Sequence, residues 1–327
     1  MSIYPWQFTQ WQRLQQQGDK LHHALLLTGE QGIGKQTFAE ALVQSLLCAQ
    51  PQADGMACNS CQNCHLLNAG NHPDFKRISV VQEDDDTDED KKSGAKKSQI
   101  LIHQIRELQD FLAISSHQGR KLILIHPAEA MNMAAANALL KMLEEPPDNA
   151  FFILLSHHYK KLPATIRSRC QQVIMPLPEQ AIALQWLQQQ RADISLQQLK
   201  YAGGSPLKAL QLEEYQECNQ LLSLLSQAGK MDIFQAVSVS AVLKMPLTVL
   251  VLQKWLHDLL ASQQGIAQRY HSMAEEKIQA LARQLETAAA LKFVDQLNYF
   301  ARHSQHPLNQ ELQYESIFLN YVQLFKS

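Results

Sequence analysis

Residues 28–37 read T-G-E-Q-G-I-G-K-Q-T, and this stretch decides the fold. It follows the P-loop pattern GxxxxGK(S/T), whose backbone N–H groups and lysine bind phosphate and whose Ser or Thr binds Mg²⁺. Gln36 stands in place of that Ser or Thr, and Thr37 lies about 100° further round the helix, which points its hydroxyl away from the metal. The residues that fit phosphate binding are Gly29, Gly32, Gly34 and Lys35. The loop is therefore predicted to have the shape of a nucleotide site that is poorly suited to hydrolysis, and the sequence leaves open whether ATP binds there.

Short apolar runs alternate with helical patterns through the first half of the chain, as in a parallel sheet with helices on both faces. The runs at 122–125 and 151–155 are apolar throughout, which is typical of central parallel strands. We expect strands at 24–28, 75–81, 121–126, 150–156 and 171–177, and helices at 35–48, 100–114 and 133–144. The predicted fold class is α/β, with a P-loop-like sheet domain over residues 1–176.

After residue 177 the strand-like runs stop, and amphipathic helical patterns continue to the end of the sequence. We expect a small helical lid domain at 177–211 and an all-α collar domain at 212–327. Pro246 marks the start of one long helix, because proline is tolerated in a first turn. The last domain can be a bundle with its own core or a surface that joins other subunits, and periodicity does not decide between them.

Residues 83–97 read E-D-D-D-T-D-E-D-K-K-S-G-A-K-K, which is seven acidic residues followed by four lysines. Such a run cannot bury enough apolar surface to order itself. We expect a solvated, mobile loop at 83–98, with a regulatory role or a basic partner as the alternative.

Four cysteines lie within seventeen positions, and their spacing is Cx9CxxCxxC: Cys48, Cys58, Cys61 and Cys64. Because cytosolic thiols stay reduced, this spacing favours a metal site over disulfides. Four thiolates make a closed tetrahedral zinc site, which stabilises a short loop and has no open position for catalysis. We expect structural zinc in a module at 48–72.

An iron–sulfur cluster is the rival interpretation, because CxxCxxC also occurs in ferredoxins. No CxxxCP follows here, and the fourth cysteine lies upstream at the end of a helix. His65 and His72 are alternative ligands if one thiolate is missing. Cys218 is isolated in a helical segment, and we expect it to be a core residue.

A P-loop hydrolase also needs an acidic pair at the end of a buried strand, to hold Mg²⁺ and to position water. His126 and Pro127 follow the strand here, and neither supplies a carboxylate. An active ATPase would have to recruit Thr37 or Glu129 to the metal instead. Two parts of the hydrolytic machinery are therefore altered, at Gln36 and at His126.

The composition narrows the class of protein. The 327 residues are 46 % hydrophobic and carry 29 basic and 31 acidic side chains. A near-neutral chain has no electrostatic footprint for holding nucleic acid by itself, so any DNA contact is local or shared with other subunits. Neither a signal peptide nor an unbroken apolar run of membrane length is recognisable, so we expect a cytoplasmic protein without a membrane partner.

Three further runs carry a resemblance to a known family. They are AAANALLKMLEEPP at 134–147, FFILLS at 151–156 and LPATIRSRC at 162–170. Together with the cysteine insertion after the P-loop helix, they resemble the clamp-loader subunits of bacterial DNA polymerase III, which belong to the AAA+ superfamily. Chance matches to motifs of this length are rare, and the motifs cover roughly residues 1–210.

The resemblance implies a pentamer that uses ATP to open a ring-shaped sliding clamp and place it on primed DNA, within the DNA-directed DNA polymerase holoenzyme. The implied partners are the gamma/tau ATPase subunits, the delta subunit, the sliding clamp and primed DNA. In this family the motif Ser168-Arg169-Cys170 presents its arginine to the nucleotide of the neighbouring subunit. Arg169 would act in trans as an arginine finger that neutralises charge on the γ-phosphate. Composition alone does not separate Arg169 from Arg167, but the motif favours Arg169.

The resemblance also gives two sensor positions. Ser156 or His157 stands where active subunits carry Thr or Asn, and Leu207 stands in place of a sensor arginine, with Lys208 displaced by one. These changes predict a subunit without ATPase activity of its own that completes the site of its neighbour. The alternative is an active P-loop ATPase of the clamp-loader type.

Overall fold

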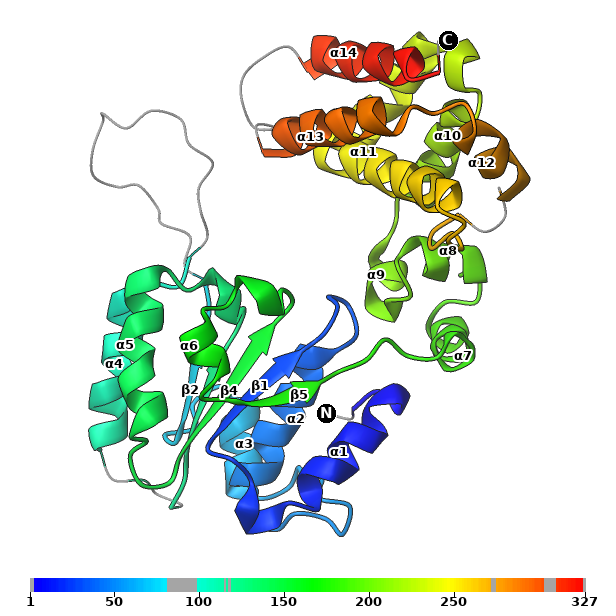
Figure 1. Cartoon of the computed structure of the whole chain (residues 1–327). Helices are drawn as coiled ribbons and strands as arrows, with labels where there is room; N and C mark the ends of the chain where they lie inside the picture. Colours follow the sequence, from blue (N-terminus) through cyan, green and yellow to red (C-terminus); the bar gives the residue numbers. More distant parts are fainter. Residues whose placement is uncertain are drawn as a thin grey trace. The chain divides into compact units, whose positions relative to one another are not determined.

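The structure is a computed structural model that describes residues 3–80, 99–114, 116, 119–271, 275–302 and 310–325. The chain divides near residue 182 into two compact units, of which the first carries a sheet and the second is helical (Figure 1). The charged loop expected at 83–98 lies outside the described residues.

Five parallel strands form the sheet of the first unit, in the order β2-β3-β4-β1-β5. They are β1 (Ala24–Thr28), β2 (Phe75–Ile78), β3 (Lys121–Ile125), β4 (Ala150–Ser156) and β5 (Gln171–Ile174). The α/β class and all five expected strands are confirmed. β2 and β5 each end three residues earlier than expected. In β5 the reason is Pro176, which has no N–H to continue the hydrogen bonding between strands.

Helices cover both faces of this sheet, since successive strand residues point to opposite sides and both sides are apolar. Leu25 and Leu27 pack with α1 (Phe8–Gln15) and α2 (Lys35–Leu47). Leu26 packs on the other face. The helices of that face are α4 (Ile102–Ala113), α5 (Met133–Glu144) and α6 (Ala164–Arg167). Short 3-10 turns are η1 (Pro5–Gln7), η2 (Gly18–Lys20), η3 (Ala128–Ala130) and η4 (Tyr159–Lys161).

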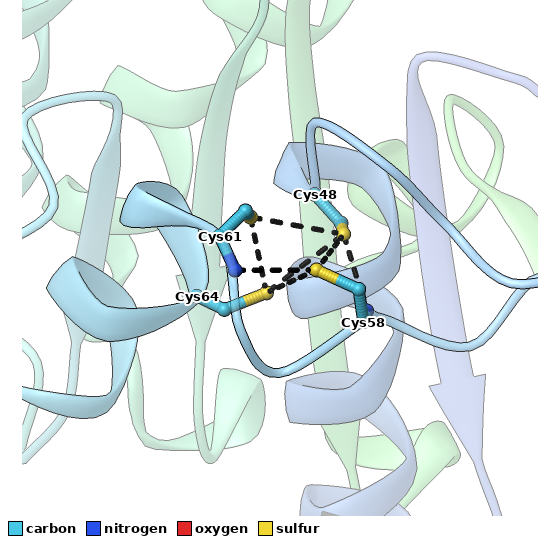
Figure 2. A group of neighbouring side chains, drawn as sticks. All are labelled: Cys48, Cys58, Cys61 and Cys64. Atoms are coloured by element: carbon cyan, nitrogen blue, oxygen red, sulfur yellow. Dashed lines mark hydrogen bonds between the residues drawn. The ribbon is translucent and has the colours of Figure 1, made fainter.

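The cysteine module is inserted between α2 and β2. Cys48 directly follows α2, and Cys64 lies in α3 (Gln62–Asn68), so that the four thiols converge (Figure 2). Side-chain hydrogen bonds join the module to the rest of the unit, and two of them come from outside α2 or lead to its last residue. The Trp11 indole donates to the Asp54 carbonyl oxygen at 2.9 Å, and the Asn63 amide donates to that of Leu47 at 2.7 Å.

Two separate hydrophobic clusters lie in the second unit. The smaller joins residues between Ala183 and Ala209, and the larger begins at Tyr201 and extends to Val322. The lid and collar boundaries expected from the sequence remain predictions. The elements are α7 (Gln180–Gln190), α8 (Leu196–Tyr201), α9 (Pro206–Gln211), α10 (Tyr215–Leu225), η5 (Ala228–Lys230), α11 (Ile233–Gln263), α12 (Glu275–Ala282), α13 (Thr287–Arg302) and α14 (Gln310–Gln323).

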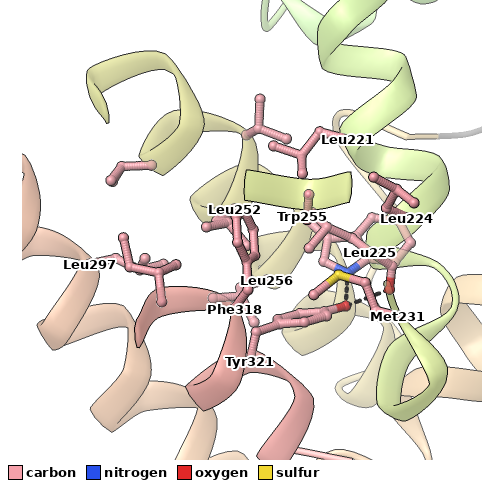
Figure 3. Packing of buried hydrophobic residues seen from close by; sticks show 14 of the residues in the cluster. Leu221, Leu224, Leu225, Met231, Leu252, Trp255, Leu256, Leu297, Phe318 and Tyr321 are labelled. Carbon is pink, nitrogen blue, oxygen red and sulfur yellow. Dashed lines mark hydrogen bonds between the residues drawn. The ribbon is translucent and has the colours of Figure 1, made fainter. Parts of the chain in front are cut away.

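Helix α11 is central to the larger cluster (Figure 3). The Trp255 indole donates to the Tyr321 hydroxyl of α14 at 2.7 Å, and that hydroxyl donates to the Leu225 carbonyl oxygen at 2.7 Å. Lys244 has φ 61° and ψ 161°, which breaks the helical backbone, so a second helical segment begins just before Pro246 as expected. α11 is long and apolar enough to cross a membrane, but 56 % of its apolar window is buried inside the unit.

Candidate functional site

The P-loop connects β1 to α2. Gly34 has φ 83°, and a Cβ added there would lie 2.3 Å from the Tyr4 ring, so only glycine fits. Lys35 is 3 % exposed, and its Nζ donates to the carbonyl oxygens of Gly29 at 2.8 Å and Glu30 at 2.7 Å. The loop leads into the N-terminal end of α2, and helix N-termini attract anions such as phosphate. The loop therefore keeps the groups that bind phosphate.

The N-terminal residues pack against this loop, a contact that sequence reasoning missed. Gln7 is fully buried, and its Nε2 donates to the carbonyl oxygens of Ile33 at 3.0 Å and Gly34 at 2.9 Å. Trp6 donates its indole N–H to the Ile33 oxygen at 3.0 Å and stacks on Tyr4 with ring centroids 4.9 Å apart. A buried glutamine in a 3-10 turn gives no periodic signal, so only the fold reveals this role.

Gln36 occupies the position of the missing Mg²⁺ ligand. Its side chain is exposed, and its Nε2 donates to Glu40 Oε1 at 3.0 Å, one turn along α2. The same Glu40 oxygen pairs with Arg77 at 2.8 Å. The amide of Gln36 is thus engaged along the helix.

Two histidines lie where the carboxyl ends of β3 and β4 meet. The Nε2 atoms of His126 and His157 are 3.3 Å apart. Burial lowers the pKa of His126, and burial together with the nearby Lys35 charge lowers the pKa of His157 to about 4. Both imidazoles are therefore neutral at pH 7 and add no negative charge to this edge of the sheet. Mg²⁺ prefers oxygen ligands, so the pair is a poor substitute for carboxylates.

Glu129 supplies the carboxylate that lies beside this pair. Its Oε1 accepts the backbone N–H of His157 at 2.9 Å. Burial opposes ionisation of Glu129, but hydrogen bonds from backbone N–H groups and from Ser156 outweigh burial and lower its pKa. Its Oε2 is buried without a partner among the described residues. The carboxylate is therefore held by the loop that follows β4.

Arg169 follows α6, at the start of β5. Its Nη1 donates to the Thr165 carbonyl oxygen at 2.9 Å and to Ser168 Oγ at 3.3 Å, and its Nη2 forms an ion pair with Glu144. Its side chain is 33 % exposed. The Arg167 guanidinium instead lies 4.8 Å from the centre of the Tyr159 ring.

Cys170, the third residue of this motif, is half-buried, and burial raises the pKa of its thiol to about 12. A protonated, partly buried thiol packs as a small apolar group. The other family position, Leu207, lies in α9 of the second unit and is half-buried there.

The four cysteines of the module form a compact cluster (Figure 2). Neighbouring Sγ atoms lie 3.5 to 4.0 Å apart, and all four thiols are free. Zn–S bonds of about 2.3 Å in a tetrahedron place sulfur atoms about 3.8 Å apart, so the cluster has the size of a four-cysteine metal site. These four cysteines could hold a metal ion.

Backbone N–H groups point at the sulfur atoms. Cys58 N–H donates to Cys48 Sγ, and Cys61 N–H donates to Cys58 Sγ, both at 3.3 Å. Hydrogen bonds from Ser60 lower the pKa of Cys58 to about 5, whereas burial raises that of Cys64 to about 12. A dication would favour the thiolate form at every position.

The two histidines considered as spare ligands stay outside this cluster among the described residues. His65 is exposed, and His72 Nδ1 accepts the backbone N–H of Asp74 at 3.1 Å.

Comparison with known proteins agrees with the motifs. The family model described as DNA polymerase III, delta subunit, matches residues 5–179. DNA polymerase III subunit delta′ of Pseudomonas aeruginosa is 42 % identical over 216 residues, which are 64 % of this chain and 61 % of that protein. Subunit delta′ of Escherichia coli is 34 % identical over 218 residues, which are 65 % of this chain and 61 % of the Escherichia coli protein. The match thus spans less than two thirds of the length of these relatives.

Solved structures of low sequence identity also align with the chain. The alignment with a DNA polymerase III gamma subunit-related protein of Thermotoga maritima covers 98 % of this chain and 100 % of that protein. The sequence identity is 18 % and the TM-score is 0.44. The clamp loader delta protein of Bacillus subtilis covers 98 % and 99 %, at 10 % identity and a TM-score of 0.38. Scores this low carry no argument about the site.

The three sequence runs at 134–147, 151–156 and 162–170, taken with the cysteine insertion after the P-loop helix, most resemble the delta′ subunit among the clamp-loader subunits. Curated relatives of that name confirm this resemblance, and the family model covers more than half of the chain. The chain therefore belongs to the DNA polymerase III delta-subunit family and resembles the delta′ subunits.

Proposed function

We propose that this chain is a clamp-loader subunit that hydrolyses no ATP and supplies Arg169 in trans to a neighbouring ATPase subunit. The observation that carries the proposal is the His126–His157 pair. Two neutral imidazoles lie where a hydrolase needs carboxylates for Mg²⁺ and for water. Because Gln36 also removes the hydroxyl ligand, the hydrolytic chemistry belongs to the neighbour's site.

Arg169 suits a role in trans. Its guanidinium is always charged, is anchored by Thr165 and Ser168, and keeps a third of its surface exposed. An arginine from outside a nucleotide site stabilises charge on the γ-phosphate only when the subunits are packed together, which couples hydrolysis to assembly. Arg167 is less suited, because its guanidinium lies against the Tyr159 ring and its Nε atom is buried.

The proposed partners are the gamma/tau ATPase subunits and the delta subunit, and through them the sliding clamp and primed DNA, in the cytoplasm. The lid at 177–211 and the collar at 212–327 would join the chain to the other subunits. Because the chain is near neutral, DNA contact would be shared by the assembly.

The test is ATP turnover by the complete loader, assembled from this chain, the ATPase and delta subunits, the clamp and primed DNA. We expect Arg169→Ala to leave assembly unchanged and to lower turnover at least tenfold, because an arginine finger contributes a factor of about 10³–10⁵ to kcat at its own site. Arg191→Ala is the matched control, since Arg191 is a half-exposed arginine paired with Asp193 outside the motif. Unchanged turnover with Arg169→Ala would refute the role in trans.

An active P-loop ATPase is the second candidate, and the intact phosphate-binding groups at Lys35 favour it. The purified chain would then hydrolyse ATP alone, and Gln36→Thr would increase the rate. We expect neither. ATP titrations with and without Mg²⁺ should give weak binding that does not depend on the metal.

We propose zinc as the ion of the cysteine cluster, because the sulfur spacing fits tetrahedral Zn–S geometry and the ligand set is closed. Elemental analysis of protein purified without added metal should give one zinc per chain. Iron and sulfide in equal amounts would favour the iron–sulfur interpretation instead.

A further inference from the structure

The partner of Arg169 within its own chain is Glu144, whose place in the fold is unusual. Glu144 is the last residue of α5, a helix that begins after an Asn132 cap. The C-terminal end of a helix carries partial negative charge, so an acidic residue there opposes the helix dipole. The location does not stabilise α5 by itself.

The ion pair between Glu144 and Arg169 is also too exposed to contribute much to stability. The side chain of Glu144 is 47 % exposed and that of Arg169 is 33 % exposed. Ion pairs at such exposure contribute little to folding, because water screens them and two long side chains lose freedom. Stability therefore does not explain why a glutamate stands at position 144.

The contacts of Arg169 suggest one. Both hydrogen bonds of Nη1 go to its own segment, at Thr165 and Ser168, while Glu144 fixes Nη2 from a different helix. Anchoring from two elements removes the rotamer freedom of a long side chain before any ligand arrives. A guanidinium has five N–H donors, so the anchored group still has donors for a phosphate.

We propose that Glu144 is a positioning residue, which holds the guanidinium of Arg169 in the orientation that meets the neighbour's γ-phosphate. The inference rests on the proposed role of Arg169 in trans. Glu144 carries negative charge, so it adds no affinity for a triphosphate. Its contribution is orientation, which is expressed in the rate of the chemical step and not in nucleotide binding.

The experiment compares Glu144→Gln with Glu145→Gln in the complete loader with clamp and primed DNA. Glu145 is the matched control, because it is the adjacent exposed glutamate and has no ion pair among the described residues. We expect Glu144→Gln to lower kcat for ATP three- to tenfold with KM unchanged or lower, and Glu145→Gln to change neither. On the Arg169→Ala background, Glu144→Gln should have no further effect.

The outcomes separate the two proposals. If Arg169→Ala leaves turnover unchanged, the role in trans is wrong and the positioning role falls with it. A second outcome is that Arg169→Ala lowers turnover, whereas Glu144→Gln leaves turnover unchanged or raises it. Arg169 would then act in trans, but Glu144 would not position it. An equal fall with Glu145→Gln, or an effect of Glu144→Gln that persists without Arg169, also overturns the inference.

Discussion

Helix α2 connects two candidate sites, and only one of them has all the groups that its ligand needs. At its C-terminal end four cysteines converge with sulfur spacing that fits a metal ion. At its N-terminal end the P-loop keeps its glycines and Lys35, but the groups that should bind Mg²⁺ are Gln36 and two neutral histidines. The same helix therefore supports one complete site and one incomplete site.

The two sites would contribute to this chain in different ways. A closed four-cysteine site acts through stability and loses its function if one ligand is lost. A P-loop without its metal ligands can still connect β1 to α2, because Lys35 and Gln7 hold its backbone through hydrogen bonds. On our proposals, the first site stabilises the fold of this chain, and the chemistry of the second comes from another subunit.

Of the changes proposed here, loss of one cysteine should lower the stability of the protein most. Cys64→Ser removes a buried ligand, and we expect loss of the metal and a fall of several kcal/mol in the free energy of unfolding. Structural zinc contributes about 10–16 kcal/mol in isolated zinc-finger peptides, and part of this is lost with the site. Elemental analysis and urea unfolding measure both. His65→Ala is the control, and metal loss in that variant would return a histidine to the ligand set.

The two sites also differ in how far the sequence predicts them. All four cysteines lie within seventeen positions, so the cluster is local, and its spacing alone predicts that the four thiols converge. The strands and α5 were predictable for the same reason, since periodicity and flanking prolines are local signals. The sequence names the altered positions of the nucleotide site, but only the fold brings them together.

Long-range contacts account for what sequence reasoning missed. Parallel pairing of β3 with β4 brings His126 to His157, thirty-one residues apart. Gln7 reaches Gly34 across 27 residues from a turn without periodicity, and Glu144 meets Arg169 from another helix. No pattern along the chain encodes such pairs.

A smaller loss of stability is expected when Gln7, which binds the P-loop backbone, is replaced. Gln7→Ala removes a buried side chain and its two hydrogen bonds to the Ile33 and Gly34 carbonyl oxygens, which should cost about 1–3 kcal/mol of stability. Gln12→Ala, on the exposed side of α1, should cost less than about 0.5 kcal/mol. Equal unfolding midpoints for the two variants would show that the loop needs no such anchor.

The incomplete site can be rebuilt to test which groups it lacks. Gln36→Thr with His126→Asp restores a hydroxyl and a carboxylate for Mg²⁺, so we expect affinity for ADP to become metal-dependent and to rise about tenfold. Gln36→Thr with His126→Asn restores the hydroxyl but no charge, and should bind no better than the unmodified chain. Calorimetric titration with and without Mg²⁺ separates these cases. Tight Mg²⁺-dependent binding by the unmodified chain would show that the site is complete as it stands.

The smallest predicted effect is a dependence of folding stability on pH, which arises from the buried histidine pair. The pKa of His157 is lowered from an ordinary value near 6.5 to about 4, so above pH 6.5 it is neutral in both the folded and the unfolded state. Between pH 6.5 and 4 the unfolded chain binds a proton that the folded chain does not. Stability should therefore be full above pH 6.5 and fall as the pH drops towards 4, by at most about tenfold in the folding equilibrium constant per pH unit.

Urea unfolding midpoints from pH 8 to 4 measure this effect, and His157→Gln is the variant that should flatten the curve. His158→Gln is the matched control, because His158 is the adjacent exposed histidine. His126 shares the direction of the shift through its own burial, so part of the slope should persist in His157→Gln. Identical curves for His157→Gln and the unmodified chain would mean that the pKa of His157 is the same in the folded and unfolded states. The sheet edge would then gain positive charge below about pH 6.5, a stronger barrier to Mg²⁺ than a neutral pair.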